Sequence, residues 1–472
     1  MSIPALTNQE VNGLLRSTPG ASSLVCVIGC SSQGTTQSLW LGSRITDLVN
    51  TWGYGPAPEL AAVKAAAGKQ VALIRVPTVT AAVAGSVTFT GTGTSVVSVT
   101  GTPYNAYSVK MLVVVGGTIA SAGIKIQYSL NGGSDYSPIY YLGTGNTFLI
   151  PNTGITLNFG AGTLVAGDTA VFTTTAPAPD ISGIQAAMDV VKLSALPIDC
   201  MAFACDATAS ILQAIDSRLV GMKPYGKHCW ALTMWPGKTV GQSDSAYTTA
   251  VNTAISGVSS DKIGMTTWSS AFTSALTGLT QEKPVLYSAF DILTPSVISE
   301  NAAAIAGHAV PTLLVDNTGN TIYHDALYDE SLSDRTITLR SWPNQPGVYI
   351  TRARLMSAPA DSAQLIIHRR LVNRGEQLAD AYFATIVNTP VRAAADGTIA
   401  PDEALRIQTG MTAALEDGLA SDASKVAYLI DKTINILTTS RIEGDLYIQP
   451  FGYPETIITR IALTATIQTA EG

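Results

Sequence analysis

The last segment of the chain alternates between apolar residues and polar or small residues. From position 461 to position 468 the sequence reads IALTATIQ. Because successive side chains of a β-strand point to opposite faces, this period of two predicts a strand with one covered face. The side expected to be covered is formed by Ile461, Leu463, Ala465 and Ile467.

Such a terminal strand has two candidate partners. The first is the edge of a sheet in its own chain, which the residues alone favour because about two-thirds of sequential strands are neighbours. The second is a sheet of another subunit, to which an extended terminal segment can add through backbone hydrogen bonds. The alternation alone leaves both partners open.

An α/β rhythm runs through two separate parts of the chain. Continuous apolar runs predict buried strands, as in SLVCVIGC at 23–30 and VALIRV at 71–76, and two helical segments lie between these runs. After residue 181 the rhythm resumes. We therefore expect one α/β domain made of residues 21–84 and 180–340. The predicted helices are 45–53, 58–68, 181–194, 210–222 and 245–258, and the later predicted strands are 197–206, 227–236, 261–268 and 283–293.

The composition changes sharply between residues 85 and 179. The charged residues there are four, Lys110, Lys125, Asp135 and Asp168, while Thr, Ser, Gly and Val dominate. Short alternating runs are separated by Gly, Asn and Pro turns, a pattern typical of a β-sandwich or small barrel. Since α/β patterns flank this segment, we expect an all-β sandwich inserted into the α/β domain.

The last third of the chain predicts an α+β domain over residues 341–455. A long amphipathic helix is expected at 362–387, with Arg369, Arg370 and Arg374 on its hydrophilic side. A second helix begins near Pro401, and strands are expected at 425–430, 433–439 and 445–450. Residues 1–20 and 456–472 are expected to be terminal arms. The predicted fold class is a multidomain combination of α/β and α+β.

Composition narrows the class of protein. Apolar residues make up 46% of the chain and charged residues only 13%, so a soluble protein of this kind needs partners to cover its surface. The net charge of −7 argues against nucleic-acid binding. No apolar run is long enough to cross a membrane, and the N-terminus does not resemble a signal peptide. The five cysteines lie in apolar runs, which predicts buried thiols and a reducing compartment.

Candidate chemistry is sparse. His308 and His324 lie near Asp325, Asp329, Glu330 and Asp334, but no zinc-ligand spacing such as HExxH occurs. Phosphate-loop, dinucleotide and GxSxG motifs are also missing from the sequence. We therefore expect no enzyme activity, no metal and no cofactor. The alternative function is a glycan-binding surface protein that uses the inserted sandwich, with Tyr136, Tyr140 and Tyr141 as candidate contacts.

The order of these motifs resembles the contractile tail sheath proteins of bacteriophages and related injection systems. The resemblance rests on SLVCVIGCSSQG, RITDLVNTWGYGP and VALIRV near the start, and on PGVYITRARLM, HRRLVNRGEQLADAYFATIV, INILTTSRIEGDLYIQP and TIITRIALT near the end. One departure is that PGVY, which many sheath proteins carry near the N-terminus, stands here at 346–349. The inserted β segment resembles the decorative domains that phage sheath proteins carry.

This resemblance implies a structural subunit that polymerises helically around a tail tube. It implies that the two arms add strands to sheets of neighbouring subunits, which reverses the preference for pairing within the chain. Contraction would drive the tube through the host envelope for genome delivery, with the baseplate and tail terminator proteins as further partners. The implied location is the virion tail, after assembly in the host cytoplasm. Arg369, Arg370 and Arg374 are candidate contacts to the tube, with a solvated helix surface as the equally weighted alternative.

Overall fold

A computed structural model describes residues 23–238, 242–315, 321–322, 334–342, 344–358 and 361–453. The central element is a six-stranded sheet of order β16-β15-β14-β1-β3-β2, in which β2 alone is antiparallel. Its inner strands are buried on both faces, which explains their continuous apolar runs. The strands are β1 (Leu24–Gly29), β2 (Leu39–Gly42), β3 (Val71–Arg75), β14 (Ile198–Asp206), β15 (Trp230–Met234) and β16 (Ile263–Thr266).

Helices cover this sheet and connect its strands. Most of them begin within two residues of the predicted positions, because side-chain caps mark their starts: Asp180, Thr208 and Ser243 each accept a hydrogen bond from a backbone N–H of the first turn. The helices are α2 (Ile45–Trp52), α3 (Pro56–Ala66), α4 (Ile181–Leu193), α5 (Ala209–Met222), α6 (Asp244–Ile255) and α7 (Val285–Leu293), and the 3₁₀ turn η1 (Lys223–Tyr225) follows α5.

The strand predicted at 283–293 is wrong. The segment VLYSAFDIL forms helix α7, which packs against α3 and is buried nearly all round. A short run that is apolar on every side has neither the period of a helix nor that of a strand, so periodicity cannot separate the two. The neighbouring strands form an antiparallel sheet of order β18-β17-β19-β20. These strands are β17 (Ser269–Thr273), β18 (Thr280–Pro284), β19 (Leu313–Val315) and β20 (Thr321–Ile322), and a hairpin of β21 (Leu339–Trp342) and β22 (Gln345–Ile350) follows.

Residues 88–173 form only β structure. A five-stranded sheet of order β4-β13-β6-β8-β9 and a three-stranded sheet of order β10-β11-β5 share one cluster of buried side chains. This cluster is separate from that of the central sheet, although Leu279 joins it from outside the segment. The strands are β4 (Thr88–Thr90), β5 (Val97–Gly101), β6 (Ser108–Val115), β7 (Gly117–Thr118), β8 (Lys125–Ser129), β9 (Tyr140–Tyr141), β10 (Thr147–Ile150), β11 (Ile155–Phe159), β12 (Thr163–Leu164) and β13 (Thr169–Thr173).

The segments that lead into and out of this β segment lie side by side. Antiparallel bridges join Thr80 to Ala178 and Ala84 to Thr174, between the end of β3 and the start of α4. Two polar contacts add to this connection: Lys283 Nζ donates to the carbonyl of Ala106 at 2.8 Å, and the backbone N–H of Thr280 donates to Asp135 at 3.1 Å. The division of the chain at 84/85, 179/180 and 340/341 stays a prediction.

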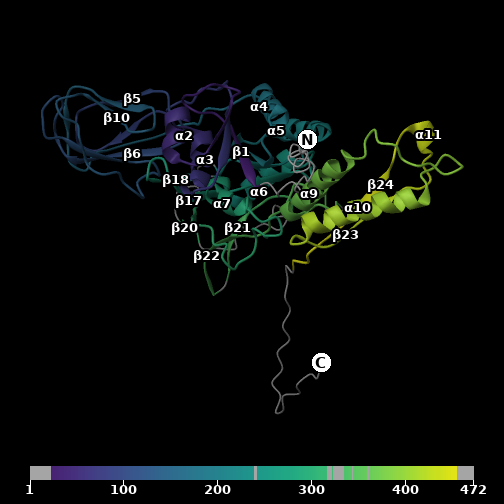
Figure 1. Cartoon of the computed structure of the whole chain (residues 1–472). Helices are drawn as coiled ribbons and strands as arrows, with labels where there is room; N and C mark the ends of the chain where they lie inside the picture. The colour runs from purple at the N-terminus through teal and green to yellow at the C-terminus, as the bar shows by residue number, and fades with distance from the viewer. Residues whose placement is uncertain are drawn as a thin grey trace, which may run out of the picture.

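Two long helices and a two-stranded sheet form what we call the C-terminal module. It contains α9 (Ile366–Phe383), α10 (Pro401–Leu419), β23 (Ala423–Ile430), α11 (Ile436–Thr439) and β24 (Gly444–Pro450). Buried residues of both helices and of β23 form a third cluster. Figure 1 shows this module at one end of the molecule and the β segment at the other, with the central sheet between them.

The strand predicted at 433–439 is also wrong. Asn435 caps a short helix there, because its side-chain oxygen accepts hydrogen bonds from the backbone N–H groups of Leu437 and Thr438. The predicted arms at 1–20 and 456–472 lie outside the described residues. Among the helices that the structure describes, none has the length and apolar character needed to cross a membrane.

All five cysteines are buried and free, as their apolar surroundings predicted. Burial raises the pKa of Cys26, Cys200 and Cys229, in the last case to about 12. These thiols therefore stay protonated and behave as small apolar groups of the core. The reducing compartment stays a prediction.

Gly375 tests the packing of α9 on β24. A Cβ at this position would lie 2.6 Å from Cδ1 of Ile448 and 3.1 Å from Cδ2 of Leu446. We expect Gly375→Leu to lower the free energy of unfolding by about 1–3 kcal/mol through overpacking. Gly221 in α5 has nothing within 4 Å, so Gly221→Leu is the matched control and should be neutral or stabilising by up to about 1 kcal/mol. Thermal unfolding followed by circular dichroism measures both, and equal effects would contradict the packing.

Candidate assembly interface

Helix α9 is buried on two sides. One side packs on α10 and β24, and the other faces the amino ends of β14, β15 and β16. Arg369, Arg370 and Arg374 are only 3%, 2% and 5% exposed. The predicted exposure of these three arginines is therefore wrong: all three are buried, and the α/β part supplies charged partners for Arg369 and Arg370. A contact between them and a tube stays a prediction, and it requires this interface to open.

Arg370 is the most completely satisfied of the three. Its Nε donates to Oδ2 of Asp199 at 3.0 Å, and its two terminal nitrogens donate to the carbonyls of Val297 and Pro295 at 2.9 and 3.0 Å. Asp199 lies at the start of β14 and is 8% exposed. Burial raises the pKa of Asp199, and the charge of Arg370 acts against that rise. The pair fixes the start of α9 to the sheet.

Arg369 connects α9 to the next strand start. Its Nη1 donates to Oδ2 of Asp261 at 2.9 Å, just before β16, and its Nε donates to Asn373 at 2.8 Å. Arg374 differs, because its Nε and Nη1 have no hydrogen-bond partner among the described residues. Burial lowers the pKa of Arg374, while the charge of Asp422 acts in the opposite direction.

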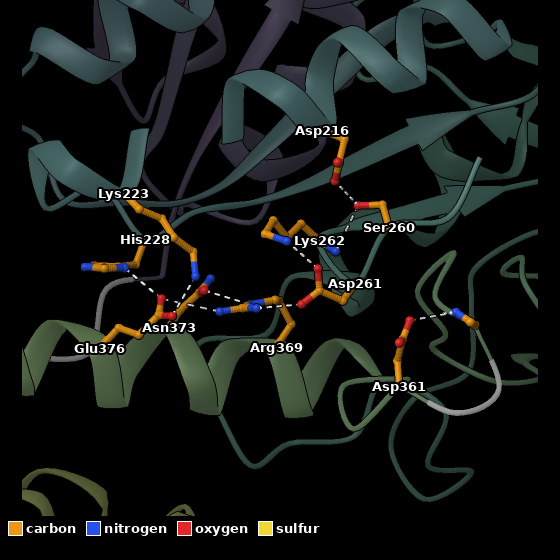
Figure 2. Close-up of polar contacts among 11 residues, drawn as sticks. Asp216, Lys223, His228, Ser260, Asp261, Lys262, Asp361, Arg369, Asn373 and Glu376 are labelled. Atoms are coloured by element: carbon orange, nitrogen blue, oxygen red, sulfur yellow. Dashed lines mark hydrogen bonds and ion pairs between the residues drawn. The ribbon is translucent and has the colours of Figure 1, made fainter. Parts of the chain in front are cut away.

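The second half of α9 carries two carboxylates that the sequence analysis did not single out. Glu376 accepts from Lys223 Nζ at 2.6 Å, and it lies 2.8 Å from Nδ1 of His228. Asp380 lies 2.7 Å from Nε2 of the same histidine. Figure 2 shows Lys223 and His228 on the α/β side, with Glu376, Asn373 and Arg369 projecting toward them from α9. We call the whole contact the α9 seam, formed by Asp199, Lys223, His228, Asp261, Arg369, Arg370, Glu376 and Asp380.

The two-stranded sheet of the module has an open edge at β24. Tyr428 of β23 donates its backbone N–H to Thr412 of α10, so Tyr428 and its partner Leu446 form a non-hydrogen-bonded pair. By the alternation of antiparallel ladders, the backbone groups of Leu446 and Ile448 then point away from β23. Among the described residues no other strand pairs with β24. An unpaired edge of this kind can accept a further strand.

A groove of about 690 Å³ lies between α9 and the two-stranded sheet. Apolar side chains on its wall come from both sides of the module, including Phe383, Tyr428 and Leu446. The groove is acidic, because its lining contains five carboxylates but only one lysine and one histidine. The carboxylates are Glu376, Asp380, Asp431, Glu443 and Asp445, and the other two residues are Lys223 and His228.

Most of the other sequence-predicted residues lie outside the described part of the chain, and their roles stay predictions. Ile461, Leu463, Ala465 and Ile467 lie outside the described residues, as do His324, Asp325, Asp329 and Glu330. His308 contacts Glu300 and the carbonyl of Ala306, while Asp334 pairs with Arg352. In the described ranges no three His, Cys, Asp or Glu residues are placed to hold a metal ion.

Two of the three candidate glycan-binding tyrosines, Tyr140 and Tyr141, do not form a common platform. Tyr140 packs against Tyr128 and Phe148 at the sandwich core. Tyr141 is 68% exposed, and Lys125 Nζ lies 5.1 Å from its ring centre. Because neighbours in a strand point to opposite faces, these two rings cannot share one flat surface.

The fold is similar to that of known sheath proteins. The PVC sheath of an extracellular contractile injection system, in its contracted state, matches with a TM-score of 0.53 and 10% identity, over 95% of this chain and 94% of that chain. Sheath tail proteins of Listeria innocua (TM-score 0.46, 10% identity, 94% and 98% covered) and Desulfitobacterium hafniense (0.44, 11%, 93% and 99%) also match. No protein-family model and no curated protein matches the chain. The chain therefore shares the fold of the PVC sheath subunit over nearly its whole length.

Removing Arg370 tests the fixed end of the α9 seam. We expect Arg370→Met to lower the free energy of unfolding by about 3–5 kcal/mol, because it leaves a buried carboxylate without its counter-charge. The double variant Arg370→Met/Asp199→Leu should recover much of that loss, since neither charge remains. Denaturant unfolding followed by circular dichroism measures the change.

Arg392→Met is the matched control. Arg392 is 74% exposed and pairs with Asp402, which is 59% exposed, so its loss should change stability little. If Arg370→Met is as stable as Arg392→Met, the ion pair with Asp199 does not fix α9 to the sheet.

Proposed function

We propose that this chain is the structural, non-enzymatic subunit of a contractile tail sheath, which polymerises helically around a tail tube. The observation that carries the proposal is the open β24 edge, found in a chain whose fold matches a sheath subunit over 95% of its length. A low share of charged residues, 13%, fits a protein that covers much of its surface with neighbouring copies.

Strand addition is the proposed mode of assembly. The strand predicted at 461–468 follows β24 closely in the sequence, and its alternation would place the larger apolar side chains on one side. Outward backbone groups at Leu446 and Ile448 supply the hydrogen bonds that such a strand needs, while the apolar side chains select the register. A strand of 12 residues spans roughly 40 Å, which is enough to reach a neighbouring subunit.

Contraction is the proposed output. Inserted strands hold neighbouring subunits together while their globular bodies rotate, so the polymer can repack without coming apart. A gain of a few kcal/mol per subunit, typical of alternative packings, becomes large when it is summed over a long polymer. The extended form is then metastable and drives the tube through the host envelope when it is released. Further proposed partners are the tube, baseplate and terminator proteins, in a virion tail assembled in the host cytoplasm.

A stop codon after Glu455 tests the proposal. We expect the full chain to form striated hollow tubes in negative-stain electron microscopy, and the shortened chain to remain monomeric because it lacks the strand that completes a neighbour's sheet. Sedimentation velocity measures the monomer fraction. Tubes formed by the shortened chain would contradict strand addition by this segment.

A pair of double variants separates strand addition from a general effect of charge. Leu463→Asp/Ile467→Asp places two charges on the side expected to be covered, and should abolish tubes. Thr464→Asp/Thr466→Asp places the same charges on the opposite side, and should retain more tubes than the first double variant. Equal loss in both variants would show that the period of two in this segment does not set its contacts.

A further inference from the structure

His228 has a carboxylate at each of its two ring nitrogens. Its Nδ1 lies 2.8 Å from Oε2 of Glu376, and its Nε2 lies 2.7 Å from Oδ2 of Asp380. An ionised carboxylate only accepts hydrogen bonds, and a neutral imidazole carries a hydrogen on one nitrogen alone. Both contacts are therefore hydrogen bonds only when the imidazole is doubly protonated.

The surroundings keep the proton on the histidine. Burial by itself lowers the pKa of His228, but its hydrogen bonds to Glu376 and Asp380 outweigh burial and raise it above 6.5. Burial also opposes ionisation of Glu376, yet hydrogen bonds from His228 and Lys223 lower its pKa to about 2. Glu376 is therefore ionised at neutral pH and cannot supply the second hydrogen.

Charged groups of both signs face this histidine from several elements. Lys227, next in sequence, turns its Nζ to the carbonyl of Leu196 at 3.1 Å and does not contact either carboxylate. The remaining groups are Lys223 on η1, Arg369, Glu376 and Asp380 on α9, and the groove carboxylates Asp431, Glu443 and Asp445. Since Asp380 is 57% exposed along the groove, protons can exchange with solvent at this point.

We propose that His228 is a proton-dependent latch between the central sheet and the C-terminal module. In the protonated form it ties the second half of α9 to the segment that leads into β15. In the neutral form one of its two nitrogens presents a lone pair to a carboxylate oxygen, so that contact is lost. The latch joins two parts of one chain, and it therefore does not depend on the proposed sheath function.

The two ends of the α9 seam respond differently to pH. At the start of α9, the Arg370 guanidinium donates to two backbone carbonyls, which do not titrate, so these contacts stay in place. Glu376 lies six residues further along the helix, about 9 Å away. Release of His228 thus loosens one end of α9 while the other end stays fixed, as a hinge requires.

The sign of the effect follows from the direction of each pKa shift. His228 has a raised pKa in the folded chain, so its stabilisation is complete below about 6.5 and is lost as the pH rises through the raised value. Glu376 has a lowered pKa, so its stabilisation is present above its ordinary 4.5 and is lost as the pH falls toward about 2. The seam is therefore tightest at mildly acidic pH and loosens toward alkaline pH.

Hydrogen exchange on the full chain tests the latch directly. Exchange at the imidazole C2 position, read by mass spectrometry, reports the pKa of each of the four histidines separately. We expect His228 to titrate above 6.5. Amide protection of residues 376–383, corrected for the intrinsic pH dependence of exchange, should fall about tenfold between pH 6 and pH 9, as expected when one hydrogen bond between charged groups is lost.

Matched variants give the result that would overturn the latch. His228→Asn should show low protection of 376–383 at both pH values, with no step, whereas His308→Asn should keep the full step because His308 contacts Glu300 instead of α9. Asp380→Asn changes an exposed partner and should lower the pKa of His228 and shrink the step, even if His228→Asn does not fold. An ordinary or lowered pKa for His228, a step that survives in His228→Asn, or a step of full size in Asp380→Asn rules the latch out.

Discussion

Helix α9 has to satisfy charge on a buried face, and the rest of the molecule is arranged around that constraint. Its apolar side packs into the C-terminal module, so its polar side is left against the central sheet. Ion pairs are costly to bury unless their remaining hydrogen-bonding groups are also satisfied. The parallel sheet meets this requirement because the starts of β14, β15 and β16 bring Asp199, His228 and Asp261 to one edge. Helix α9 also contacts β24, whose outer edge is unpaired among the described residues.

The α/β part could be predicted from sequence because its signals are local. Continuous apolar runs and capping residues mark β1, β3, β14 and helices α4 to α6 within a few residues. Two helices were predicted as strands. The apolar run of α7 has no clear period, and the run at 433–439 alternates like a strand although Asn435 caps a short helix there. The β-rich segment was recognisable by its composition, because few charges and many turn residues distinguish it from its flanks.

The seam could not be predicted in the same way. A helix with three arginines on one side reads as solvent-exposed unless its partners are known, and here those partners lie more than 100 residues earlier in the chain. His228 also carries no motif. The only signal available was a polar residue placed directly before a buried strand, which is common at any strand start. The role of these residues is decided by tertiary contacts and not by local sequence preference.

The route of the chain around the β segment has an evolutionary meaning. Because isolated antiparallel bridges join its two ends at Thr80–Ala178 and Ala84–Thr174, the segment leaves and re-enters the α/β part at one place and interrupts no strand of the central sheet. The part of the chain beyond these bridges can change in size or fold by recombination, provided that its contacts with Leu279, Thr280 and Lys283 are kept or replaced. Descendants of one ancestral scaffold could then diverge in their outer parts while their inner parts stay interchangeable.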